Sequence, residues 1–277
     1  MNVGIVGLGL MGGSLAIAMR KLSFINNIYG LDHNKEHQAQ AMKLQLVDAL
    51  IDFEKLTQLD IIILAIPVNG VIKTLEMLEG KVQEHTTIID LGSTKEIIVN
   101  AVPDTLRQNF VAAHPMTGTE NNGPTAAIEG LYNDKVVVLC DLDDSGIYQQ
   151  EIAVRLFSGI HMRLSYMHAH EHDRHAAFIS HMPHVISYSL ANAVLDQEDK
   201  YNILAMAAGG FRSMSRLAKS SPNMWEDIFK QNKNNLLDAI EIFEAELTTL
   251  KKEIKSDAWD DVREKMHKAN SLQEIFS

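Results

Sequence analysis

The chain has 277 residues, of which 46% are hydrophobic and 22% are charged, an ordinary composition for a globular protein. A chain of this length usually folds as two domains rather than around one compact core. Its formal net charge of −11 repels phosphate backbones and argues against nucleic-acid binding as the main role. A small anionic substrate stays compatible with this charge, because a binding site needs only a few local cations.

The single cysteine, Cys140, excludes a disulfide within the chain, and its place in the apolar run Val136–Cys140 predicts a buried thiol. No apolar stretch approaches the ~18 residues that span a membrane. The sequence passes from Met1 directly into a strand pattern, so no signal peptide is expected. Together these features predict a cytoplasmic protein without a membrane partner.

The first half of the chain alternates short apolar runs with helical patterns. Runs that are apolar throughout are typical of parallel strands covered on both faces. Helical patterns lie between several of them, for example at 13–22 and 35–46, so the order predicts an α/β domain with a doubly wound parallel sheet of the Rossmann type. The strands are expected at Val3–Val6, Asn27–Leu31, Asp60–Ile66, Thr87–Asp90, Phe110–Ala113 and Lys135–Cys140.

From about His168 onward, strand-like runs vanish and helical spacing dominates, with Ser221-Pro222-Asn223 marking a helix start. We therefore predict a dinucleotide-binding domain at residues 1–166 and an all-α domain at 167–277. Helical domains of this size often bury apolar faces against a second subunit, so a homodimer is expected. The long helical segments are expected at Glu171–Leu195, Tyr201–Lys219 and Met224–Lys255.

A glycine motif, G-L-G-L-M-G, follows the first predicted strand and opens the first predicted helix, which is the context that a dinucleotide site needs. In this interpretation Gly7 permits the tight turn, Gly9 lets a pyrophosphate approach, and Gly12 lets helix and strand pack closely. The helix N-terminus, with Leu10 and Met11, then faces the phosphates. The alternative is a glycine turn that binds nothing.

Asp32 ends the second predicted strand, twenty residues after the last glycine of the motif. A carboxylate there can accept hydrogen bonds from the hydroxyls of the adenine ribose and would repel a 2′-phosphate, so NAD is favoured over NADP. Lys35 lies close and could soften this preference. The alternative role for Asp32 is a cap at the N-terminus of the following helix.

Two of the predicted strands run into polar segments, Asp90–Lys95 and His114–Glu120. Ligands gather at this edge of a parallel sheet, and the pKa of an imidazole suits proton transfer near neutral pH. His114 is therefore a candidate catalytic base, and Ser93 could orient its ring or contact the substrate. The alternatives are a loop histidine that caps backbone groups, and a helix-capping Ser93 followed by a solvated lysine.

Seven of the twelve histidines fall between His161 and His184. Ser180 and His184 are four residues apart and share a helix face, and Pro183 is expected to kink the helix so that polar side chains enter a cleft. The first part of this tract has the character of an exposed helix start. It lacks H-E-x-x-H or a cysteine partner, so no metal site is expected.

Two arginines, Arg212 and Arg216, follow a glycine pair and are four residues apart. Guanidinium groups suit the bidentate recognition of carboxylates, whereas the alternative is a solvated basic helix face. Trp225 is most simply a core or interface aromatic.

Taken together, the motifs G-L-G-L-M-G-G-S, D-L-G-S-T-K, H-P-M-T-G-T-E, S-H-M-P-H and G-G-F-R-S-M-S-R resemble those of the prephenate dehydrogenases. The likeness spans roughly residues 1–255 and implies a dinucleotide domain followed by a helical dimerisation domain. It implies that His114 is the catalytic histidine, that Ser93 supports it and contacts substrate and nicotinamide, and that Arg216 binds a prephenate carboxylate.

The resemblance also implies that Arg212 is a neighbouring basic residue, that Ser180 and His184 line the substrate pocket, and that Thr119 and Glu120 flank the same cleft. Ser213 stands where the family commonly has Asp.

The implied reaction is the NAD-dependent oxidative decarboxylation of prephenate to 4-hydroxyphenylpyruvate, a step toward tyrosine. The sequence leaves open whether prephenate or its amino analogue arogenate is preferred, and whether tyrosine inhibits the enzyme. Two rival interpretations keep the scaffold: a β-hydroxyacid dehydrogenase, which usually places a catalytic lysine on a long central helix, and a non-catalytic protein that senses NAD or binds a metal.

Overall fold

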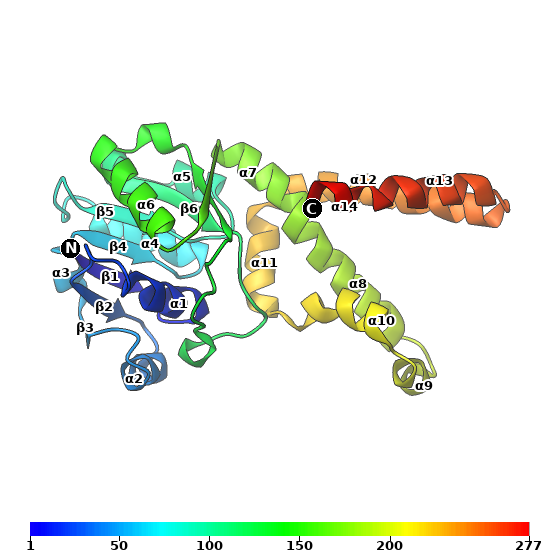
Figure 1. Cartoon of the computed structure of the whole chain (residues 1–277), viewed down its shortest axis with the longest axis horizontal. Helices are drawn as coiled ribbons and strands as arrows, with labels where there is room; N and C mark the ends of the chain where they lie inside the picture. The colour runs from blue at the N-terminus through cyan, green and yellow to red at the C-terminus, as the bar shows by residue number, and fades with distance from the viewer. Residues whose placement is uncertain (277) are drawn as a thin grey trace. The chain divides into compact units, whose positions relative to one another are not determined.

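A computed structural model describes residues 1–276 of the chain, which form two compact units, the first from Met1 to Asn232 and the second from Lys233 onward. The first unit, drawn in blue to yellow in Figure 1, contains a sheet, the helices that cover it and a helical extension. The predicted domain boundary at 166/167 lies inside this unit. That boundary remains a prediction about domains rather than a division seen in the contacts.

Within residues 1–276, eight strands form one sheet in the order β3-β2-β1-β4-β5-β6-β7-β8 (Figure 1). All neighbouring strands are parallel except β6 and β7. The predicted Rossmann-type α/β class, followed by helices, is confirmed. The strands are β1 (Asn2–Val6), β2 (Asn27–Leu31), β3 (Ala49–Leu50), β4 (Ile61–Leu64), β5 (Thr87–Asp90), β6 (Phe110–Pro115), β7 (Val136–Cys140) and β8 (Arg163–Met167).

The sheet differs from a purely parallel one at β7, where Ala112 pairs with Cys140 and Pro115 with Val137 in antiparallel register. A parallel neighbour needs a crossover, usually through an α-helix. The connection at 116–135 contains only the short 3₁₀ helix Pro124–Ala126, so the chain returns along the neighbouring edge in the opposite direction. Strands β3 and β8 were not predicted, because β3 has two residues and β8 is a half-exposed edge strand of mixed polarity.

Helices cover both faces of the sheet, because successive residues of its apolar strands point to opposite faces and both faces must be buried. Ile61 and Ile63 join the core beneath α1 (Leu10–Met19), α2 (Lys35–Lys43) and α6 (Ile147–Gly159). Ile62 and Leu64 point to the other face and pack with α3 (Phe53–Leu56), α4 (Val68–Leu78) and α5 (Glu96–Asn100). Burial on both faces explains why these strands are continuously apolar in sequence. Further 3₁₀ helices are Asp104–Asn109, Leu142–Asp144 and Arg216–Lys219.

The helical extension of the first unit begins with α7 (Ala169–Ala176), continues through a π-helical turn (Ala177–His181) and runs on as α8 (Met182–Leu195). Pro183 is the second residue of α8, and the π-helical turn ends two residues before it. The kink expected at Pro183 stays a prediction, and the irregularity that the structure has is this wider turn. The predicted segment Tyr201–Lys219 is divided into α9 (Lys200–Ala205), α10 (Gly209–Met214) and a 3₁₀ helix, and α11 (Pro222–Gln231) begins at the predicted Pro222.

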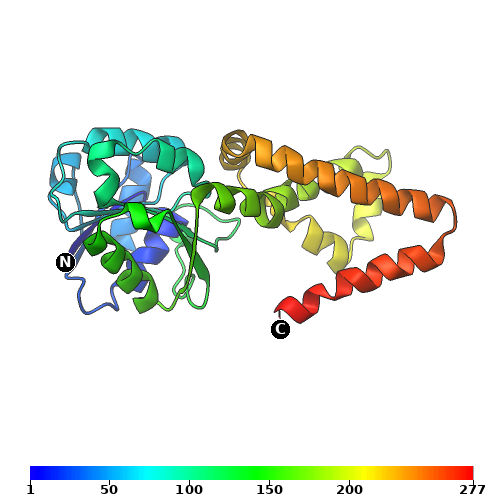
Figure 2. The same cartoon turned by 90° about the horizontal axis from the view of Figure 1, so that it is seen from above.

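The second unit consists of α12 (Lys233–Lys255), α13 (Trp259–Asn270) and α14 (Leu272–Phe276). Helices α12 and α13 contact each other as an antiparallel pair, drawn in orange and red in Figure 2. The predicted helix Met224–Lys255 is thus two helices that meet at Asn232. None of the helices in residues 1–276 has the length and apolar character that crossing a bilayer requires.

Candidate active site

The glycine turn after β1 lies where the strand order reverses, with β2 on one side of β1 and β4 on the other, which is the position where open α/β sheets bind ligands. Gly7 has a φ of +93°, and a Cβ there would collide with the backbone of Ala65. A Cβ on Gly12 would collide with the carbonyl oxygen of Gly7. Both positions therefore require glycine.

Gly9 caps α1 without a side-chain hydrogen bond, and the nearest atom to a Cβ there would be 3.9 Å away. The first N–H groups of α1, which begins with Leu10 and Met11, are consequently left for an anion. This open cradle at a helix N-terminus fits the pyrophosphate of a dinucleotide.

Asp32 follows β2 and is 8% exposed. Its Oδ2 accepts a hydrogen bond from the Leu8 N–H at 2.9 Å, and its Oδ1 accepts one from the Asn34 N–H at 2.8 Å. The cap of α2 is Asn34, which accepts hydrogen bonds from Glu36 and His37, so the alternative of Asp32 as helix cap is wrong. The carboxylate is instead held against the glycine turn.

His114 projects from β6 toward the face of the sheet that carries α5 and α7. It lies two residues after Ala112, which packs on that face, and every second residue of a strand points to the same side. Its imidazole is 9% exposed, and its Nδ1 lies 2.7 Å from Nε2 of His172. Burial, together with the nearby His172, Lys95 and His181, holds the pKa of His114 well below its usual range. A neutral imidazole at neutral pH is the form that can act as a base.

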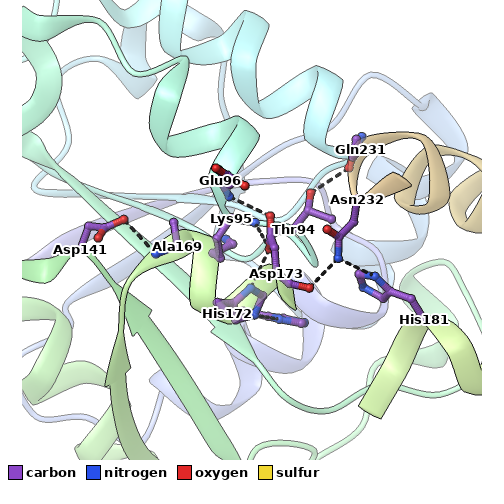
Figure 3. Close-up of polar contacts among 12 residues, drawn as sticks. Thr94, Lys95, Glu96, Asp141, Ala169, His172, Asp173, His181, Gln231 and Asn232 are labelled. Atoms are coloured by element: carbon purple, nitrogen blue, oxygen red, sulfur yellow. Dashed lines mark hydrogen bonds and ion pairs between the residues drawn. The ribbon is translucent and has the colours of Figure 1, made fainter. Parts of the chain in front are cut away.

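The other ring nitrogen of His172 faces the buried carboxylate of Asp173 (Figure 3). Nδ1 of His172 lies 2.8 Å from Oδ1 of Asp173. Asp173 also accepts hydrogen bonds from the N–H of Lys95 at 2.8 Å and of Glu96 at 3.0 Å, and its own carbonyl accepts one from Asn232 Nδ2 at 2.6 Å. The start of α5, α7 and the end of α11 are thus joined at one buried group.

Lys95 is fully buried, which contradicts the alternative of a solvated lysine. Its ammonium pairs with Asp90 and donates a hydrogen bond to the carbonyl of Ala113 at 2.8 Å. Asp90 accepts a hydrogen bond from the N–H of Ala113 at 3.3 Å. Burial raises the pKa of Asp90, and the adjacent ammonium lowers it in turn. The pair therefore holds the backbone immediately before His114 from both sides.

Removing one partner of this pair should destabilise the protein strongly, because the other charge would remain buried without compensation. For Lys95→Met we expect the free energy of unfolding to fall by about 3–5 kcal/mol. Urea denaturation followed by circular dichroism measures this change. Lys230→Ala, which breaks the exposed Lys230–Glu226 pair, is the control and should be close to wild type. Equal stability of Lys95→Met and Lys230→Ala would contradict the structural role of the pair.

The sequence did not indicate His172 or Asp173 as site residues, because their charged tract suggested an exposed helix start, and it left Lys95 as the solvated lysine of one alternative. A signal was present: Ala169, His172, Asp173 and Ala176 recur at helical spacing, and all four are buried. Ser93 is half-buried, and the ring nitrogen of His114 contacts His172 rather than Ser93. Ser93 does not cap α5, whose N-cap residue is Lys95.

His184 is 9% exposed and stacks on Trp225, with ring centroids 3.3 Å apart. Its Nδ1 donates a hydrogen bond to the carbonyl of Ser180 at 2.9 Å, so the predicted pair is joined through backbone. Burial lowers the pKa of His184, and the charge of Arg216 lowers it further. Trp225 is 6% exposed, as expected for a packed aromatic.

Arg216 pairs with Glu120, with Nη1 3.4 Å from Oε2 and 55% of the arginine side chain exposed. The two predicted substrate residues are therefore in contact, although they are 96 positions apart. Thr119 precedes Glu120 in the loop, and its Oγ1 accepts a hydrogen bond from the N–H of Asn121 at 3.2 Å. Arg212 is exposed on α10 and donates to the carbonyl of Ala207 at 3.2 Å, whereas Arg216 begins the next helix.

The loss of stability at low pH tests the burial of His181, which lies beside Asn232 and Asp173. Its Nδ1 lies 3.0 Å from Asn232 Nδ2, and its buried Nε2 has no hydrogen-bond partner within residues 1–276. Burial lowers the pKa of His181 to about 4. Because the unfolded chain takes up the proton below pH 6.5 and the folded chain does not, stability should be lost as the pH falls from about 6.5 to about 4.

We expect the wild type to lose about 3 kcal/mol more than His181→Leu between pH 7 and pH 4. Urea titrations at both pH values give the difference for each protein, so any uniform destabilisation of the variant cancels. Parallel losses in the two proteins would show that His181 does not carry this linkage.

Comparisons with known proteins agree with this geometry. Residues 15–166 match the family model described as "Prephenate dehydrogenase, nucleotide-binding domain", and residues 168–268 match "Prephenate dehydrogenase, dimerization domain". The chain belongs to the prephenate dehydrogenase family.

Relatives in this family cover most of the chain. The prephenate dehydrogenase of Bacillus subtilis is 35% identical over 84% of the chain, which spans 65% of that protein's length. The cyclohexadienyl dehydrogenase of Zymomonas mobilis is 32% identical, over 94% of the chain and 90% of the relative. The crystal structure of prephenate dehydrogenase from A. aeolicus, in complex with hydroxyphenyl propionate and NAD+, superposes with a TM-score of 0.92 at 30% identity and covers 100% of the chain and 98% of its own.

The predicted family, the oxidoreductase class and the use of NAD are confirmed by these matches. The rival interpretation as a β-hydroxyacid dehydrogenase is not supported. Across residues 1–276, no three His, Cys, Asp or Glu side chains are arranged to hold a metal ion.

Proposed function

We propose that the chain catalyses the oxidative decarboxylation of prephenate to 4-hydroxyphenylpyruvate, with reduction of NAD+. The reaction removes a hydride from the ring carbon that carries the hydroxyl and releases the carboxylate of the opposite ring carbon as CO2, so that the ring becomes aromatic. The observation that supports it best is the buried, neutral imidazole of His114 at the carboxyl edge of the sheet, in a chain of this family.

In this proposal His114 accepts the proton of the substrate hydroxyl through Nε2 while the hydride leaves. It returns a proton to the phenolate oxygen after CO2 has left, so the base ends the cycle unchanged. General-base help of this kind contributes about 10²–10⁴ in rate. Ser93, two residues before the buried Lys95, would contact the substrate near the same atoms.

The substrate carries two carboxylates, and Arg216 is the guanidinium that we assign to one of them. Its exposed pairing with Glu120 leaves it ready to exchange that partner for a ligand carboxylate. His184 and Ser180 would line the pocket, with Thr119 flanking it. Arg212, whose side chain is turned to a backbone carbonyl, would contribute positive charge rather than direct contact.

For the cofactor, the cradle of Gly7, Gly9 and Gly12 with the start of α1 would hold the pyrophosphate, and Asp32 would accept the ribose hydroxyls. When bound, NAD+ supplies the hydride acceptor. The protein's own contribution is to hold the two rings together and to polarise the hydroxyl.

The deciding experiment is a steady-state assay at 340 nm with prephenate or arogenate, each with NAD+ or NADP+. We expect the largest kcat/KM with prephenate and NAD+. Absence of NADH formation with both substrates would overturn the proposed reaction. A larger kcat/KM with arogenate would keep the chemistry and change the substrate, an outcome for which the name of the cyclohexadienyl relative leaves room.

We also propose a homodimer formed through the helical region, with functional domains at 1–166 and 167–277. The match to a dimerization domain supports it, as do the exposed apolar side chains of α12, among them Leu237, Ile242 and Leu247. Sedimentation velocity tests it, since one chain has a mass of 30.9 kDa and a dimer would have twice that. The cytoplasm is the proposed location, because the one cysteine is a free buried thiol.

A further inference from the structure

We infer that His172 and Asp173 are positioning residues that fix the tautomer of His114, so that its Nε2 is the nitrogen free to accept a proton. The inference rests on the proposed function, since it assigns these residues to the same catalytic base. The residues act through His114 and are not placed in contact with the substrate.

The donor in each of the two hydrogen bonds, Asp173–His172 and His172–His114, follows from the carboxylate of Asp173, which can only accept. Both carboxylate oxygens of Asp173 accept backbone N–H groups, from Lys95 and Glu96, so the carboxylate is an acceptor throughout. The ring nitrogen that faces it, Nδ1 of His172 at 2.8 Å, must therefore donate. A neutral imidazole has one N–H, which leaves Nε2 of His172 as an acceptor.

That acceptor lies 2.7 Å from Nδ1 of His114. Two bare nitrogens at this distance would make no hydrogen bond, so Nδ1 of His114 carries its proton and Nε2 does not. The reverse tautomer would place a lone pair against a lone pair in a site where His172 is 2% exposed and His114 is 9% exposed. Because water cannot compensate there, the preference is strong.

The carboxylate at the far end is itself fixed, which makes the arrangement a positioning device rather than a chance contact. Asp173 is 2% exposed, and its backbone carbonyl is tied to Asn232. The Asp90–Lys95 pair holds the other side, through Ala113 next to His114. The Asp173 end of this series of hydrogen bonds is thus anchored to Lys95, Glu96 and Asn232 (Figure 3), and the His114 end is anchored through Ala113.

Two substitutions at position 172 separate positioning from mere packing. His172→Phe keeps a buried ring but removes the acceptor, and we expect turnover to fall about 10²-fold. An aspartate-to-asparagine change in an Asp–His pair, which selects the wrong tautomer, can cost about 10⁴. His172→Gln places a carbonyl oxygen near the former Nε2 and should recover at least about tenfold of the loss, because His114 Nδ1–H again has an acceptor. His175→Phe, on the exposed side of α7, is the matched control and should behave as wild type.

The pH profile of kcat/KM adds a readout that packing alone does not change. The groups that lower the pKa of His114 include Lys95, His172 and His181, with Asp173 and Asp90 behind them. Loss of His172 changes the group that faces Nδ1 of His114, so the acid limb of the profile should shift along the pH axis, whereas a purely structural defect lowers activity at all pH values equally.

The direct test is the tautomer itself, measured by long-range 1H–15N correlation spectra of 15N-histidine-labelled protein, with His114→Asn to assign the ring. We expect a protonated Nδ1 and a bare Nε2 on His114 in the wild type, and a larger share of the Nε2–H tautomer in His172→Phe, which offers Nδ1 of His114 no acceptor. A protonated Nε2 in the wild type, or turnover of both Asp173→Asn and His172→Phe within threefold of wild type, would overturn the inference. These spectra need no substrate, so an inactive wild type would refute the proposed reaction and leave the tautomer measurable.

Discussion

Replacing His114 by asparagine should reduce turnover with prephenate by about 10²–10⁴, because the variant lacks the base that accepts the hydroxyl proton. Asparagine keeps a polar group that can still reach His172, so the fold should be retained. Binding of NAD+, measured by fluorescence titration, should change little, since the glycine cradle and Asp32 are untouched. His85→Asn, which changes a half-exposed histidine just before β5, is the control.

The role of His114 as base also predicts how the activity of the wild type depends on pH. The reaction needs neutral His114, and burial keeps the pKa of this imidazole well below its usual value. Activity should therefore hold as the pH falls from 7 through 6.5 and decline only at lower pH. Near-normal turnover of His114→Asn, or an acid limb centred above pH 6.5, would remove His114 from the role of base.

Replacing Arg216 by alanine should raise the KM for prephenate with much less change in kcat, because a carboxylate contact that is equal in the ground and transition states affects binding alone. A hydrogen bond to a charged group contributes about 1.5–3 kcal/mol, which corresponds to a KM increase of about 10- to 100-fold. Because 55% of the Arg216 side chain is exposed, we expect an increase in the lower part of that range.

Arg216→Lys should lie between alanine and wild type, because it keeps the charge but loses the two-pronged geometry. Arg163→Ala serves as the control: Arg163 is exposed on β8 and bonds to the backbone of Asp134. An unchanged KM for Arg216→Ala, with normal NAD+ binding, would place the substrate carboxylates elsewhere.

The parts of the fold that the sequence predicted are those in which local pattern and burial agree. Strands such as β4 are apolar on both faces, and the glycine turn requires glycine for steric reasons, so both were readable from residue types alone. Strand β8 was missed because an edge strand needs no continuous apolar run. The direction of β7 was missed because nothing in Val136–Cys140 records which way its neighbour runs; the helix-free connection before it decides this.

The candidate site divides in the same way. His114 was predicted because it lies in the motif at the end of a strand. Its partner was not, because the burial of His172 depends on α7 packing against α5, and the backbone N–H groups that donate to Asp173 lie 77 and 78 positions away in sequence. Likewise, the pairing of Glu120 with Arg216 joins a loop to a distant helix. Sequence indicated which residues carry chemistry, and tertiary contacts determined which of them act together.

The π-helical turn at Ala177–His181 sets the rotational phase between the two halves of one continuous helix. In an uninterrupted α-helix, residues twelve positions apart, such as His172 and His184, would point about 120° away from each other. A wide turn that absorbs one extra residue reduces this angle to about 20°, so both imidazoles face the same side. Deleting a single residue from this turn would therefore swing the whole of α8, and His184 with it, away from the side that His172 faces. The segment should tolerate substitution far better than any change in length.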